Sequence, residues 1–278
     1  MNLEKENNSG FNDLPKSPPL HLWRRVGGEV DINCDMGEGI GNDELIMPFI
    51  TSVNIACGYH AGDAATMWQT VESAIKRNVS IGAHPSFLDR KNFGRTEMDL
   101  EMEEIYDLVT QQLIILNEIT SELETKLQHV KPHGALYNMS AKDLSLANTI
   151  ARAVKDFDTS LILFGLSGSH SISEAKKIGL QTVSEVFADR TYQDDGSLTP
   201  RSQPHALIEE TDKAVAQVLQ MIKEGTVTTV SGKIIPIVAE TICIHGDGKN
   251  VVEFAKAIHE TLLKNNILIS SPHKKIGA

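Results

Sequence analysis

The sequence predicts an α/β protein folded as a seven-stranded (β/α) barrel of the glycoside hydrolase/deacetylase type. Short β-rich runs alternate with amphipathic helical stretches along most of the 278 residues. Repeated strand–helix units give parallel strands joined by right-handed crossovers. About seven such units within about 220 residues favour a closed or nearly closed barrel over an open sheet.

The predicted strands are seven β-rich runs, at residues 29–33, 52–56, 79–83, 128–131, 160–164, 181–185 and 241–245. Residues 234–238 form an additional candidate strand. Between the runs, apolar residues recur at spacings of three and four, the helical period. One predicted helical face carries Met67, Val71, Ala74 and Ile75, and similar faces lie within 105–116, 214–222 and 251–258.

The barrel is expected to form one domain over residues 29–269. Residues 1–28 mix Asn, Ser, Gly, Pro and charged residues without periodicity, which predicts a flexible N-terminal leader. Residues 270–278 are expected to form a polar tail.

Composition and charge limit the binding partners and the cellular compartment that we expect for this protein. The net charge of −11 argues against a nucleic-acid or anionic-membrane surface, although an acidic protein can still hold a local basic pocket. No run approaches the roughly 18 apolar residues of a membrane span, and the N-terminus lacks a signal-peptide core. Three widely spaced cysteines cannot all pair, so a reduced, cytoplasmic location is expected.

Polar residues stand at the ends of six of the seven predicted strands, each of which delivers a His, Asp, Glu or Lys. Active sites of β/α barrels lie at the carboxyl ends of the strands. The pattern therefore predicts a catalytic group made of Asp35, His60, His84, Lys131, His133 and His245. The expected substrate-binding residues are Asn33, Asn54, Arg90, Arg95, Asp189 and Arg190.

Strand alternation assigns these side chains to faces of the sheet. Three sets share a face: Asp31, Asn33 and Asp35; Lys131 and His133; Cys243 and His245. If Lys131 points into the barrel mouth, His133 does too. Cys34 then points outward, which weakens it as a nucleophile, and all three cysteines are interpreted as small buried hydrophobes.

Three glycine-containing segments fall short of known motifs. Residues 37–42 lack the spacing of a dinucleotide turn, because Asn42 stands where the third glycine belongs. Residues 225–234 have too many residues between the glycines for a Walker loop, and Ile234 replaces its Ser or Thr. Residues 165–169 are one residue short of a nucleophile elbow, since Ser169 replaces its last glycine. This last segment could still hold an anion at a helix N-terminus or be a plain strand–helix turn, but the chain shows no phosphate-cradling Gly-Lys-Ser/Thr loop.

A metal site has candidate ligands but no local signature. The residues Asp35, His60, His84, His133 and His245 could supply three ligands. No H-x-x-x-H or C-x-x-C spacing supports this, and ligands drawn from separate strands leave no such mark. No tightly bound metal is therefore expected.

Taken together, several segments resemble the LamB/YcsF family of lactam-utilisation proteins. They are residues 31–39 with Gly41, 54–63, 81–86, 89–90, 93–95, 130–138, 187–192 and 245–247. The match keeps its order over residues 29–248. The departures are Met36, Tyr59 and the pair Phe87-Leu88, and none of them removes a polar group.

The resemblance implies a seven-stranded β/α barrel related to glycoside-hydrolase and polysaccharide-deacetylase barrels. It also implies an ATP-dependent 5-oxoprolinase activity, which opens the lactam 5-oxoproline (pyroglutamate) to L-glutamate. Members of the family are the A subunit of that enzyme, so the chain would act with partner B and C subunits. ATP and its Mg²⁺ would be bound with or by those partners.

Opening an unstrained lactam needs activation, because water attacks such an amide slowly. Phosphorylation of the amide oxygen would create a leaving group, and the chain would then supply a base, an acid and cations. Asp35 or His60 is a candidate base, and His133 or His245 a candidate acid. The candidate anion-binding cations are Lys131, Arg90 and Arg190, with Arg95 and Arg201 in a secondary role.

Other interpretations of the same residues stay open. Asp89–Arg90 and Asp189–Arg190 could be ion pairs that only fix the rim. The chain could be a non-catalytic substrate-binding or scaffold subunit, although so many acid–base residues at one rim argue against binding alone. A metal-dependent, deacetylase-like hydrolase is a third alternative, which rests on the analogy of the barrel.

Overall fold

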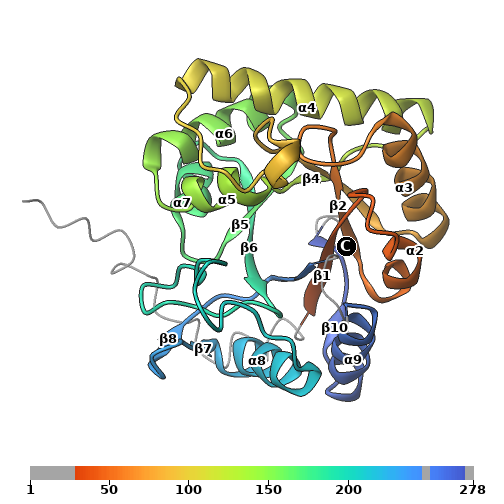
Figure 1. Ribbon diagram of the computed structural model, residues 1–278. Helices are drawn as coiled ribbons and strands as arrows, with labels where there is room; N and C mark the ends of the chain where they lie inside the picture. The colour runs from red at the N-terminus through yellow and green to blue at the C-terminus, as the bar shows by residue number, and fades with distance from the viewer. Residues whose placement is uncertain (1–28, 246–250, 273–278) are drawn as a thin grey trace, which may run out of the picture.

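The computed structural model describes residues 29–245 and 251–272, and in this part of the chain seven parallel strands close into a barrel (Figure 1). The strands, in spatial order, are β1 (Glu29–Met36), β2 (Ser52–Ala56), β3 (Ser80–His84), β4 (His129–Val130), β5 (Ile162–Leu166), β6 (Gln181–Phe187) and β9 (Thr241–His245). Pairing of β9 with both β6 and β1 closes the ring. The predicted fold class is confirmed.

Helices surround the strands in Figure 1. The main ones are α3 (Ala64–Arg77), α4 (Met102–Glu122), α6 (Leu144–Phe157), α7 (His170–Lys177), α8 (Thr211–Glu224) and α9 (Val251–Lys264). Shorter turns are α2 (Asp43–Ile46), η1 (Met47–Phe49), η2 (Arg90–Asn92) and α5 (Gly134–Ser140). No helix in the described ranges is both long and apolar enough to span a bilayer.

Helix α3 illustrates how the sequence determines where a helix begins and ends and which face it buries. The Asp63 side chain accepts a hydrogen bond from the Thr66 amide, which caps the first turn. The helix ends at Asn78, which takes the left-handed conformation at φ 55°. Met67, Val71 and Ala74 are buried against the barrel as predicted, whereas Ile75 is 42% exposed, so the apolar face is narrower than its sequence suggests.

Some strands differ from the prediction in their length or in the strand with which they pair. The strand predicted to end at Asn33 runs to Met36, because residues 33–36 pair with β2. The candidate strand at 234–238 becomes β8 (Ile234–Pro236), which pairs antiparallel with β7 (Thr226–Thr228) outside the barrel. A strand not predicted, β10 (Leu268–Ile269), pairs with the start of β1. The predicted leader, 1–28, and residues 273–278 of the tail lie outside the described residues.

Polar side chains fill much of the barrel interior. Asp31 is fully buried on β1 and accepts hydrogen bonds from the hydroxyls of Thr51, Ser52 and Thr241. His129 stacks on Phe164 with ring centroids 4.2 Å apart. Because buried polar groups must be hydrogen-bonded, this interlocked layer fixes the strands beneath the mouth of the barrel.

Candidate functional site

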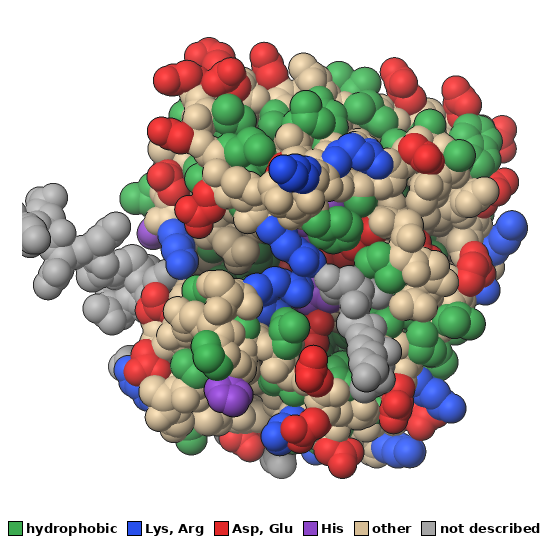
Figure 2. Space-filling view, in the orientation of Figure 1, with side chains coloured by type: hydrophobic (Ala, Val, Ile, Leu, Met, Phe, Trp, Pro, Cys, Tyr) green, Lys and Arg blue, Asp and Glu red, His purple; other side chains and the backbone are tan. Residues whose placement is uncertain are grey.

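A cavity of about 450 Å³ opens at the carboxyl ends of the strands. Its lining includes Asp35, His84, Lys131, His133 and His245 of the predicted catalytic group, with the predicted binding residues Arg95 and Arg190. The volume lies in the range of small-molecule sites. Figure 2 shows the hollow near the middle of this face, with Lys and Arg side chains gathered around it.

The lining is cationic although the whole chain is acidic. It holds five basic residues, Arg95, Lys131, Lys142, Arg190 and Arg201, against two acidic ones, Asp35 and Glu97. The net charge of the chain is −11. A cleft with this local excess of positive charge attracts anions of small size.

Lys131 lies at the bottom of the cavity in a buried charge network. Its Nζ is 2.9 Å from Asp35 Oδ1, 3.0 Å from Glu185 Oε1 and 3.0 Å from Cys243 Sγ. Burial alone would lower the Lys131 pKa, but the negative charge around it, that of Asp35 above all, holds this pKa well above its ordinary value. The residue is therefore a fixed cation.

Two hydrogen-bonded asparagines connect Asp35 to Glu185. Asn54 Nδ2 donates to Asp35 Oδ1 at 2.8 Å and to Asn33 Oδ1 at 2.7 Å, and Asn33 Nδ2 donates to Glu185 Oε1 at 2.9 Å. Although burial opposes it, the charges of His84 and Lys131 hold the Asp35 pKa well below its ordinary value. Both asparagines are fully buried and do not line the cavity, so they orient Asp35 and Glu185 rather than contact a ligand there.

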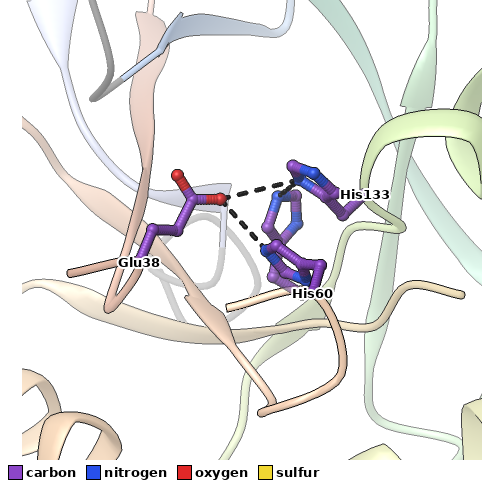
Figure 3. Close-up of side chains that lie close together, drawn as sticks. Glu38, His60 and His133 are labelled. Atoms are coloured by element: carbon purple, nitrogen blue, oxygen red, sulfur yellow. Dashed lines mark hydrogen bonds and ion pairs between the residues drawn. The ribbon is translucent and has the colours of Figure 1, made fainter. Parts of the chain in front are cut away.

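Three histidines and Glu38 form a second cluster beside this network (Figure 3). His133 Nδ1 lies 2.8 Å from His84 Nε2, and His84 Nε2 lies 3.3 Å from Asp35 Oδ2. His60 stacks on His133 with centroids 3.8 Å apart, and Glu38 Oε1 lies 3.1 Å from His60 Nε2. Figure 3 shows Glu38 pointing toward both His60 and His133.

Burial keeps two of these imidazoles uncharged. It lowers the His60 pKa to about 2, with the neighbouring His84 acting in the same direction. The same two causes, together with His60, hold the His133 pKa well below its ordinary value. Both rings are neutral at physiological pH and can offer a nitrogen lone pair.

His245 enters the cavity from β9 and is paired with Asp189. Its Nδ1 lies 2.9 Å from each carboxylate oxygen of Asp189. Although burial opposes it, His245 lowers the Asp189 pKa. A carboxylate at Nδ1 fixes the ring orientation and tautomer, which leaves Nε2 as the reactive nitrogen.

Of the predicted substrate-binding arginines, Arg95 and Arg190 line the cavity and Arg90 does not. Arg95 lies over the Phe93 ring at the cavity wall, 4.9 Å from its centroid. Arg190 also lines the cavity, and its guanidinium donates to the Thr199 and Ala206 carbonyls. Arg90 is not in the lining; it donates to the Gly58 and Gly62 carbonyls and so fixes the loop after β2.

The alternative ion-pair interpretation does not match the hydrogen bonds of the two aspartates. Asp89 caps η2 by accepting from Asn92. Asp189 binds His245 rather than the adjacent Arg190.

Sequence reasoning missed several members of the two clusters. Glu38 lies in the loop after β1, and Glu185 lies inside β6, where its inward direction depends on the pairing of the strand. Cys243 is buried as predicted, but its sulfur contacts Lys131, so it is more than a small hydrophobe. Strand parity was the available signal, because it places Cys243 on the same face as His245.

Among the described residues, two groups of side chains place potential metal-ligand atoms close together. One ligand atom from each of Glu38, His60, His84 and His133 lies within 4.8 Å of the others, and a second such group comprises Asp35, Cys243 and His245. These ligands come from separate strands and loops, so no local spacing in the sequence reveals the first group.

The fold and site define a parallel β/α-barrel protein with a cationic, histidine-rich cavity at the carboxyl ends of its strands. A model of the LamB/YcsF family matches residues 30–277, and the chain belongs to this family. The resemblance seen in the sequence is thereby confirmed.

Curated relatives and a solved structure agree with this assignment. The chain is 50% identical over 247 residues to a 5-oxoprolinase A subunit of Bordetella parapertussis, covering 87% of this chain and 98% of that protein. It is 51% identical to the protein of the same name from Staphylococcus aureus (strain Newman), covering 87% and 99%. The crystal structure of a lactam utilization protein from Thermus thermophilus superposes with a TM-score of 0.81 at 39% identity, over 87% of this chain and 99% of that one.

Proposed function

We propose that this chain is the ring-opening subunit of an ATP-dependent 5-oxoprolinase, which converts 5-oxoproline to L-glutamate through a phosphorylated lactam. The observation that carries the proposal is the five-cation cavity above the Lys131–Asp35 pair. The substrate bears a carboxylate, and phosphorylation of its amide oxygen would add a second anionic group. The names of the relatives, 5-oxoprolinase A subunit and lactam utilization protein, support this substrate class.

The positions of the side chains suggest how they divide the reaction. Lys131, Arg190 and Arg95 would hold the carboxylate and the phosphate in a partly water-excluded cavity, where charges interact strongly. Water would add to the activated ring carbon and the ring C–N bond would break, which leaves an acyl phosphate and the free amine. A second water would then hydrolyse the acyl phosphate to the carboxylate of glutamate and inorganic phosphate. The cations that orient the substrate would therefore also stabilise the negative charge of the departing phosphate.

Two groups are placed for the proton transfers. Asp35 is a carboxylate in the cavity wall and is our candidate base for the attacking water. His60, the other candidate from the sequence, is absent from that wall. His245, oriented by Asp189, is our candidate acid for the departing nitrogen.

Partner subunits would supply the activation step. No segment of this chain has the spacing of a nucleotide-binding loop. Two large hydrophobic side chains, Ile40 and Leu88, are 38% and 65% exposed on the loops that follow β1 and β3, on the rim of the barrel at the carboxyl ends of its strands. We assign this rim to contact with the B and C subunits, which would bind ATP and Mg²⁺ and shield the phosphorylated intermediate. Three buried, unpaired cysteines fit a cytoplasmic location for this complex.

Reconstitution tests the proposal. The chain alone should show neither ATPase activity nor 5-oxoproline hydrolysis, and addition of the B and C subunits should restore both in a coupled manner. ATP-dependent glutamate formation by the chain alone would refute the division of labour. If the complex with His245→Ala turned over as fast as wild type, the chain would instead be a binding subunit.

A further inference from the structure

The backbone fixes the tautomers of two facing histidines. His84 Nδ1 lies 2.7 Å from the Lys131 carbonyl oxygen, and His133 Nε2 lies 2.9 Å from the Phe93 carbonyl oxygen. A carbonyl only accepts, so each of these nitrogens carries the hydrogen. His133 Nδ1 is then a bare acceptor, and it faces His84 Nε2 at 2.8 Å, a nitrogen that also lies 3.3 Å from Asp35 Oδ2.

The carboxylate of Glu38 lies beside these nitrogens. His60 Nε2 is 3.1 Å from Glu38 Oε1, and because a carboxylate only accepts, His60 Nε2 donates to it. His60 Nδ1 lies 3.0 Å from the Ser86 hydroxyl. The same carboxylate oxygen lies 3.6 Å from His133 Nδ1.

Ligand atoms of three side chains converge beside Glu38 Oε1. One ligand atom each of Glu38, His84 and His133 lies within 4.8 Å of the others. The side chains of these three residues are no more than 7% exposed, so water screens a charge between them poorly. A single cation at this point would be held by the Glu38 carboxylate and the His133 Nδ1 lone pair, with His84 Nε2 as the third ligand atom.

We propose that Glu38, His84 and His133 bind a divalent transition-metal ion, with His60 holding the carboxylate of Glu38 from the opposite side. Tetrahedral coordination with bonds of about 2.0–2.2 Å places ligand atoms about 3.3–3.6 Å apart. Glu38 Oε1 and His133 Nδ1 are 3.6 Å apart, within this range, whereas the two histidine nitrogens are 2.8 Å apart and would have to separate by about 0.5 Å on binding. Stacked rings whose planes lie 6° apart cannot both hold one ion in their plane, which excludes His60 as a simultaneous ligand in this geometry.

Each histidine of the assigned set has the outer partner typical of a metal ligand. The hydrogen bonds from His84 to the Lys131 carbonyl and from His133 to the Phe93 carbonyl orient the rings and raise their basicity. Two imidazoles with one carboxylate suit Zn²⁺ or Fe²⁺ and leave coordination positions open. Because His84 and His133 line the cavity, an open position would face the ligand space.

Metal binding can be measured on the full-length chain without its partners, so the result is independent of the proposed reaction. After treatment with a chelator, wild type should rebind one Zn²⁺ per chain by calorimetry and develop a visible absorption band with Co²⁺. Glu38→Gln and His133→Gln should weaken Zn²⁺ binding by more than about 100-fold, beyond the 10–100-fold loss typical of outer partners. The matched control is His245→Ala, which leaves the three ligands in place and should bind like wild type.

Three results would overturn the assignment. They are failure of wild type to bind either ion, unchanged binding by Glu38→Gln, and loss of binding in His245→Ala. The last would place the ion on Asp35, Cys243 and His245 instead. Circular dichroism of each variant separates loss of a ligand from loss of the fold, and the isosteric Glu38→Gln keeps the test usable if His133→Gln fails to fold.

Discussion

Lys131 Nζ lies 2.9 Å from Asp35 Oδ1, and both side chains are at most 5% exposed. The pair belongs both to the barrel framework and to the cavity. Lys131 Nζ also contacts Glu185 of β6 at 3.0 Å, and Asp35 lines the cavity. Removal of the Lys131 charge would leave Asp35 and Glu185 buried without the cation that they share. The cavity floor is therefore part of the framework of the barrel as well as of the candidate site.

Replacement of Lys131 by Met should thus destabilise the fold. Loss of one partner from a buried ion pair typically costs about 3–5 kcal/mol. The matched control is Lys213→Met, which breaks the exposed ion pair with Glu210 and should cost less than about 1 kcal/mol. Free energies of unfolding from urea titrations measure both. Equal stabilities of the two variants would contradict a structural role for the Lys131 network.

His245 should matter for turnover rather than for folding, because its side chain is 15% exposed and its described bonds go to Asp189. In the reconstituted complex, His245→Ala should lower kcat by about 100–10,000-fold, the usual range for a general acid. Asp189→Asn should lower it as well, since Asp189 positions the ring. The control is His205→Asn, at an exposed residue with φ 62° that Asn tolerates.

The cationic lining should select anions. The double variant Lys142→Ala, Arg201→Ala removes two exposed cations from the cavity wall and leaves the buried network intact. We expect it to weaken binding of inorganic phosphate to the chain by at least about tenfold, or 1.4 kcal/mol. Added salt should weaken the binding to wild type more than to the variant. Calorimetry at two ionic strengths tests this, and equal affinities would remove both residues from the anion site.

Sequence reasoning reached the barrel because strand and helix periods alternate strongly, and it reached the cavity because strand ends meet at one rim. Strand parity placed Asp31, Asn33 and Asp35 together, and in the structure their side chains join the polar network inside the barrel. His129 is different: it lies in a strand of two residues, and its ring packs where a Cβ at Gly82 would overlap it. Such a fit depends on the neighbouring strand, which no local pattern specifies.

Glu38 was missed for a related reason. It follows the end of β1, between Gly37 and Gly39, which have φ values of 71° and 79°. These left-handed glycines turn the chain, so strand parity no longer says where the Glu38 side chain points. The metal-binding arrangement likewise depends on backbone carbonyls of Phe93 and Lys131, which are set by loop conformation rather than by residue type.

The cysteines give a test that needs no substrate. Cys34, Cys57 and Cys243 are all buried, and burial raises each thiol pKa, that of Cys57 to about 12. Only the thiolate reacts with disulfide reagents, so these thiols should stay unreactive in the folded protein at pH 8, although an ordinary thiol there is partly ionised. A chromogenic disulfide reagent should detect close to none of the three in native protein and all three in urea. Rapid labelling of one thiol in the native state would show that a buried cysteine is reached by solvent, and Cys243→Ser would reveal whether the cavity is the route.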